Sequence, residues 1–127
     1  MFDKLLTKAI YVKVYENRFV LKLLEEGETP ITIVATEPFT TKRLLVGQFM
    51  AAERALKKGF ADIFSGKWFS PNPVVVIHPL EKVDDGLSDV EERVLRELAA
   101  GTGARKVTVW LGRELSDAEA RQRANTA

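Results

Sequence analysis

The sequence predicts a single α/β domain over residues 1–127, built on a mixed five-stranded sheet with about three helices. Three observations lead to this prediction. Residues 9–35 alternate between apolar and polar with the period of strands, residues 74–77 form an unbroken apolar run, and elsewhere apolar residues recur every three or four positions. The order of elements predicts an antiparallel three-strand meander, extended by two parallel strands through right-handed crossovers.

The meander is predicted from alternation interrupted by polar turns. Ile10, Val12 and Val14 alternate with more polar neighbours, and residues 16–18 supply a tight turn. Residues 19–24 form the returning strand, followed by a second turn. Residues 30–35 are rich in β-branched side chains and give the third strand.

A long helix is predicted next, followed by a central strand. Gly47 favours a helix start near Gln48, Gly66 favours a stop, and Gly59 costs roughly 1 kcal/mol against alanine, which allows a break there. The run at residues 74–77 is typical of a strand covered on both faces. The apolar positions that define the helix are Leu45, Phe49, Ala52, Leu56, Phe60 and Ile63.

The second half of the chain contains two helix-start signatures. Ser88 and Glu91 have the spacing of a capping box, which predicts a helix from Asp89, and residues 116–119 repeat the signature before a polar end expected to fray. Gly101 or Gly103 is expected to end the first of these helices in a left-handed conformation. The expected buried stripe is Val90, Val94, Leu95 and Leu98, and the expected last strand contains Val107, Val109 and Leu111.

Composition and charge exclude several classes of function. The chain has 19 Lys and Arg against 18 Asp and Glu, so no global field draws it to nucleic acid. It has no cysteine and one histidine, His78, which excludes thiolate and His-pair metal sites. No apolar stretch approaches the roughly 18 residues of a spanning helix, and no secretory signal is evident, so a cytoplasmic location is expected.

Residues 1–8 form a short amphipathic lead-in with two interpretations. Phe2, Leu5 and Leu6 share one helical face, which makes them candidate membrane contacts for a protein peripheral to the inner membrane. Alternatively, the same side chains pack onto the domain, since a segment of two turns or fewer is marginal as an isolated helix.

Residues 88–107, SDVEERVLRELAAGTGARKV, resemble the MreB branch of the actin-like ATPases in an ungapped run. Residues 45–49 and 74–79 look like two further segments of that family. The resemblance implies a ribonuclease H-like fold, shortened to a copy of the first large subdomain, in which residues 36–43 replace an insertion subdomain. It also favours the membrane interpretation of the N-terminal segment.

The resemblance also implies that the nucleotide site is lost. The first phosphate-binding hairpin should fall at residues 12–18, where no glycine or serine occurs, and Lys13 lies about where the family has its aspartate. No nucleotide, metal or other cofactor and no enzymatic activity are therefore expected. The resemblance gives Glu91 the position of a water-orienting glutamate, with a catalytic role only if nucleotide binds; otherwise Glu91 is the capping partner of Ser88.

Three further sets of residues have both a functional and a structural interpretation. His78 is either a general base or a packed strand end. Asp84 and Asp85, with Glu91 and Glu92, are either the acidic cluster of a nuclease or a solvated surface. Lys57, Lys58 and Trp68 are candidate contacts for single-stranded nucleic acid, or else Trp68 covers the edge of the core.

These observations favour a non-catalytic, actin-like interaction module, linked through the MreB resemblance to bacterial cell shape or the envelope machinery. A solitary subdomain should expose apolar surface, which predicts a protein partner or a homo-oligomer. The alternative is a ribonuclease H-like nucleic-acid-binding protein or metal-dependent enzyme.

Overall fold

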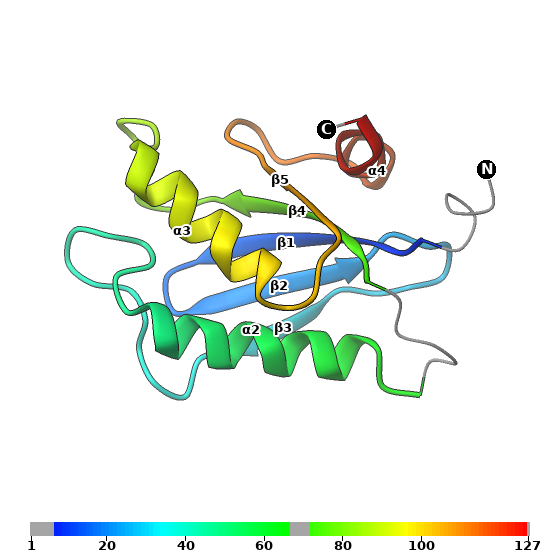
Figure 1. The fold of residues 1–127 in the computed structure, drawn as a ribbon, viewed down its shortest axis with the longest axis horizontal. Helices are drawn as coiled ribbons and strands as arrows, with labels where there is room; N and C mark the ends of the chain where they lie inside the picture. The colour runs from blue at the N-terminus through cyan, green and yellow to red at the C-terminus, as the bar shows by residue number, and fades with distance from the viewer. Residues whose placement is uncertain (1–6, 67–71, 127) are drawn as a thin grey trace.

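A computed structural model of the protein describes residues 7–66 and 72–126, and the elements below are those of the described residues. The five strands are β1 (Ala9–Tyr15), β2 (Arg18–Leu23), β3 (Ile31–Val34), β4 (Val74–Pro79) and β5 (Lys106–Val109). The helices are α2 (Phe49–Ile63), α3 (Asp89–Ala100) and α4 (Asp117–Thr126). The strands form one sheet in the order β3-β2-β1-β4-β5 (Figure 1).

The topology confirms the predicted fold class. β1 pairs antiparallel with β2, and β2 with β3, while β1 pairs parallel with β4, and β4 with β5. β4 lies inside the sheet and is buried along its whole length, as its unbroken apolar run predicts. The β1–β2 turn contains Asn17 at φ 58°, a left-handed conformation that asparagine tolerates better than most residues.

One face of the sheet, called the front here, is covered by α2 and α3 (Figure 1). Alternate strand residues such as Val12, Leu21 and Ile77 point into this core and are fully buried. The break that Gly59 would allow does not occur. A Cβ on Gly59 would lie 3.1 Å from side-chain atoms of Leu21 and Ile33, so the glycine lets α2 approach the sheet closely.

The back of the sheet is covered by α4 and the segment that precedes it. Tyr11, Val74 and Val76 point to this side and contact Ala120 and Ala124 of α4. Both alanines are almost completely buried, and the polar C-terminal segment, which the sequence analysis expects to fray, forms a helix to Thr126.

Two details differ from the sequence-based expectations, and a third resolves an open alternative. Val90 is 72% exposed and does not belong to the buried stripe of α3. Gly101 keeps a right-handed helical conformation at φ −66°, and Gly103, at φ +97°, is the left-handed residue. β5 ends at Val109, so Leu111 lies beyond the strand and is exposed.

Candidate functional site

The β1–β2 hairpin tip is the place where the sequence suggests a lost phosphate-binding loop. Its backbone amides are bonded to other parts of the chain. The N–H of Glu16 donates to Oε1 of Glu81 at 2.6 Å, and the N–H of Asn17 donates to Oγ1 of Thr40 at 3.0 Å. A phosphate would have to displace these acceptors to reach the same amides.

The side chain of Asn17 strengthens this arrangement. Its Oδ1 accepts from the N–H groups of Phe39 and Thr40, both at 2.8 Å. Phe39 is fully buried and stacks on Phe19, with ring centroids 4.9 Å apart. We call Glu16, Asn17, Phe39, Thr40 and Glu81 the hairpin latch, because they tie the turn to the two loops beside it.

Lys13 and Glu91 do not meet at this hairpin. Nζ of Lys13 lies 3.0 Å from Oε2 of Glu114, in an ion pair on the back of the sheet. Glu91 and Ser88 form the predicted capping box, in which the N–H of Glu91 donates to Oγ of Ser88 and the N–H of Ser88 donates to Oε1 of Glu91. The carboxylate that contacts the hairpin amide is that of Glu81.

A buried polar chain holds the segment before α4 to the back of the sheet. The N–H of Leu115 donates to Oη of Tyr11 at 3.1 Å, and Oη lies 2.7 Å from Nδ1 of His78. Nε2 of His78 lies 2.9 Å from the carbonyl oxygen of Gly112. Since a carbonyl only accepts, Nε2 carries the proton, and the Tyr11 hydroxyl donates to Nδ1 of the neutral ring.

Burial sets the ionisation of both side chains. It lowers the pKa of His78 and raises the pKa of Tyr11, so both stay neutral at pH 7. His78 is fully buried, and both of its ring nitrogens are hydrogen-bonded. Of the two interpretations of His78, general base or packed strand end, this geometry corresponds to the second. Tyr11 belongs to no sequence motif. The one sequence feature that could have indicated its role is its place in the first strand, on the face opposite Ile10, Val12 and Val14.

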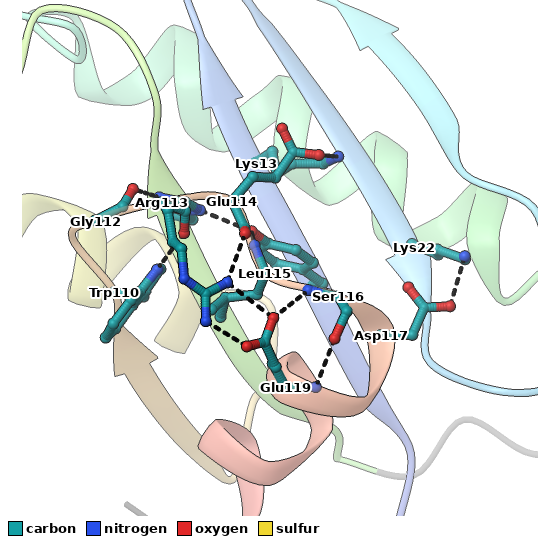
Figure 2. Close-up of polar contacts among 12 residues, drawn as sticks. Lys13, Lys22, Trp110, Gly112, Arg113, Glu114, Leu115, Ser116, Asp117 and Glu119 are labelled. Carbon is teal, nitrogen blue, oxygen red and sulfur yellow. Dashed lines mark hydrogen bonds and ion pairs between the residues drawn. The ribbon is translucent and has the colours of Figure 1, made fainter.

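Ion pairs lie around the hydrogen-bonded network of Tyr11, His78 and Leu115 (Figure 2). Lys22 pairs with Asp117 at 2.6 Å, and Arg113 makes a two-pronged contact with Glu119. The Arg113 guanidinium, helped by the N–H of Ser116, lowers the pKa of Glu119 to about 2. The acidic residues at the start of α4 are therefore bonded to basic side chains within the molecule.

An apolar groove lies beside the N-terminal parts of α2 and α3. It contains a cavity of about 160 Å³ and continues into a more open hollow of about 400 Å³. We call the two together the α2–α3 groove. Its lining residues are Leu44, Leu45, Val46, Phe49, Pro79, Val83, Leu87, Ser88, Val90, Glu91, Arg93, Val94, Leu95 and Glu97.

Exposed apolar side chains gather at this groove. Leu44 is 40% exposed and Val90 is 72% exposed, and both line it. An exposed apolar cluster around a concave surface is typical of an interaction site.

Residues of opposite charge flank the groove on its two sides. The loop that carries Leu44 also carries Lys42 and Arg43, and the first turn of α3, which carries Val90, also carries Asp89. Within residues 7–66 and 72–126, none of these three charged side chains forms an ion pair.

The nucleic-acid hypothesis is not favoured by the described part of the chain. Lys57 lies 3.9 Å from a carboxylate oxygen of Glu53, and Lys58 lies 3.0 Å from Asp62, so both charges are partnered. Trp68 lies outside the described residues. Among the residues that are described, no group of three or more His, Cys, Asp or Glu side chains could hold a metal ion.

The membrane hypothesis stays a prediction. Phe2, Leu5 and Leu6 lie outside the described residues. None of the helices formed by residues 7–66 and 72–126 is long and apolar enough to cross a bilayer.

Comparison with known proteins finds sequence relatives of two kinds, YjaA and MreB. No protein-family model matches it. It is 30% identical over 97 residues to the Escherichia coli K-12 protein YjaA, covering 72% of this chain and 74% of YjaA. It is 35% identical over 81 residues to the cell shape-determining protein MreB of Haemophilus influenzae, and 33% identical over 81 residues to MreB of Escherichia coli K-12. The chain spans about a fifth of the length of these MreB proteins.

Solved structures of MreB5 from Spiroplasma citri have the same fold. The ADP-bound form gives a TM-score of 0.61 over 84% of this chain and 38% of MreB5, at 13% identity. The AMPPNP-bound form gives 0.59 over 82% of this chain, at 14% identity. The predicted resemblance to MreB is therefore confirmed in sequence and in fold. The chain belongs to the family of Escherichia coli YjaA and is built as a part of the actin-like fold of MreB.

Proposed function

We propose that this chain is a non-catalytic, actin-like interaction module that associates with a second copy of itself through the α2–α3 groove. The observation that supports it best is that Leu44 and Val90, two of the large apolar side chains exposed in the described residues, both line this groove. Because the MreB relatives are named as cell shape-determining proteins, we place this association in the machinery of cell shape.

A second copy suits the groove because the two sides of the groove are complementary in charge. In a two-fold arrangement, the same surface meets itself in the opposite orientation. Lys42 and Arg43 of one copy then face Asp89 of the other, while Val90 of each copy enters the partner's groove beside Leu44. The unpaired charges and the exposed apolar side chains both acquire partners.

The absence of catalysis is part of the same proposal. The hairpin amides bond to Glu81 and Thr40, and Lys13 occupies the place of a metal-binding aspartate in the MreB resemblance. A lysine cannot ligate Mg²⁺. Calorimetric titration with ATP or GTP and Mg²⁺ is expected to give no binding heat, and tight binding would reopen a catalytic role for Glu91.

Light scattering over a range of concentrations tests the association directly. We expect wild-type protein to form a reversible oligomer, and both Val90→Ser and Leu44→Ser to lower its average mass. Leu111→Ser is the matched control, since Leu111 is 42% exposed, almost the same as Leu44, but lies away from the groove lining. A wild-type monomer at high concentration that binds no hydrophobic dye would contradict the proposal.

A charge swap distinguishes specific charge pairing from nonspecific hydrophobic association. Lys42→Glu with Arg43→Glu makes both sides of the groove acidic, and Asp89→Lys replaces the acidic partner of Lys42 and Arg43 with a like charge; each change is expected to weaken association. The three substitutions together restore complementarity and should recover most of the wild-type mass. Failure of the triple variant to recover would rule out this pairing of the two sides.

A further inference from the structure

The two edges of the sheet are protected differently. At the β5 edge, the guanidinium of Arg96 donates to the carbonyl oxygen of Val107 at 2.9 Å, and Lys106 starts the strand with a charge. β3 forms the other edge and reads Ile-Thr-Ile-Val, with no charged residue. Natural sheets usually protect their edges with charge, proline or a covering group, because open strand edges pair with other chains.

The register shows which β3 groups point outward. The N–H of Ala35 donates to the carbonyl of Asn17 at 2.9 Å, so this pair is a hydrogen-bonded one. Hydrogen-bonded pairs alternate along an antiparallel ladder, which places Ile31 and Ile33 on bonded pairs with β2. The N–H and C=O groups of Thr32 and Val34 therefore face away from the sheet. Neither residue has any other hydrogen bond in the described chain.

We propose that β3 pairs antiparallel with β3 of a second copy, about a two-fold axis at Ile33. This register sets Thr32 opposite Val34 of the other copy and joins the outward N–H and C=O groups of these residues in four hydrogen bonds. The two sheets become one continuous sheet. This contact goes beyond the groove and does not depend on it.

Side-chain chemistry supports the same occupant. Val34, 67% exposed on the back of the sheet, lies opposite Thr32 of the other copy in this register, and its side chain packs against the Thr32 methyl group. The register sets Thr36 opposite Pro30, and Glu37 opposite Thr29, so no like charges meet at the flanks. A second copy thus satisfies the donors, the acceptors and the exposed valine together.

The test uses protein in which the groove is disabled by Val90→Ser, so that the remaining association reports the edge alone. Sedimentation equilibrium is expected to show a weak dimer of this variant. Adding Thr32→Pro removes an outward donor without touching the ladder to β2, because the Thr32 N–H does not bond to β2. Loss of two of the four intermolecular bonds should raise the dissociation constant roughly tenfold or more.

A second variant guards against misfolding of the first. Val34→Lys puts a charge on the edge and is expected to abolish the dimer, whereas Ala118→Lys, which adds the same charge to an exposed position on α4, should leave it intact. A monomeric Val90→Ser protein, or a dimer that survives both β3 changes, would overturn the edge proposal. The first result would leave the groove proposal standing.

Hydrogen exchange gives a residue-level readout. The amides of Thr32 and Val34 should become protected as protein concentration rises, while the amide of Ile33, bonded to β2, stays protected throughout. Rates for Thr32 and Val34 that do not change with concentration would also overturn the proposal.

Discussion

The front and the back of the sheet are held by different kinds of contact. On the front, α2 and α3 bury a large apolar core and the hairpin latch closes one end. On the back, α4 contributes two small alanines, and a buried polar chain with ion pairs supplies much of the attachment. Apolar packing contains no charges that salt could screen or pH could titrate, whereas the polar attachment contains both kinds of group. The difference indicates that α4 is the layer most easily released.

The largest effect is expected from Phe39→Ala on the front. It removes a fully buried ring that stacks on Phe19 and should lower the free energy of unfolding by about 3–5 kcal/mol. Urea unfolding followed by circular dichroism measures this. Phe49→Ala is the control, because Phe49 is half-buried at the start of α2 and its loss should cost less. Equal losses for the two variants would show that the latch does not stabilise the front.

Tyr11→Phe tests the polar attachment on the back of the sheet, because it removes a single oxygen atom. It leaves Nδ1 of His78 and the N–H of Leu115 without partners in a buried place, at a cost of roughly 1–3 kcal/mol. Tyr15→Phe is the control, since Tyr15 is half-buried at the end of the same strand. We expect faster hydrogen exchange in α4 but not in α2. Uniform acceleration would mean that the two sides unfold together.

Acidification should selectively weaken the attachment of α4 to the back of the sheet. Burial lowers the pKa of His78 in the folded protein below its ordinary value of 6.5, so the unfolded chain takes up the proton first. Stability from this group is complete above about pH 6.5 and is lost as pH falls through and below that value. Lys13 and Glu114 also face His78 and act in opposite directions on its pKa. Urea unfolding between pH 8 and 5 measures the slope, and His78→Gln, which removes the chain's one histidine, should flatten it.

The smallest effects are expected from the two helix caps. Ser88→Ala and Ser116→Ala each remove a capping hydroxyl that accepts from the third residue of a helix, at a cost of about 1 kcal/mol. The chemical change is identical on the two sides. Exchange of α4 amides should rise more than exchange of α3 amides, because α3 is held by Leu95 and Leu98 in the front core. The reverse order would contradict the comparison of the two sides.

Local patterns in the sequence predicted most of the fold. Both capping boxes, the meander and the central strand follow from residues a few positions apart. Val90 was placed wrongly because helical periodicity identifies a stripe but not where the sheet beneath it ends. The stripe continues past the core, and there Val90 forms part of the groove.

The polar features could not be predicted because their partners are distant in the sequence. Tyr11 meets His78 across 67 positions and Leu115 across 104 positions. Glu16 meets Glu81 across 65 positions. The candidate residues of the N-terminal segment and Trp68 lie outside the described structure, so the membrane and nucleic-acid contacts assigned to them remain predictions.

The hairpin latch also determines where this chain tolerates additional sequence. Phe39 and Thr40 are fixed to Asn17, and the N–H of Thr41 donates to the carbonyl of Leu44, so the loop is pinned on both sides of Lys42 and Arg43. Residues added between these two exposed positions would extend a closed loop whose ends stay in place, at an entropic cost that grows only slowly with length. A foreign peptide or small domain inserted there should leave the sheet unchanged, while separating two charges that the proposed association uses.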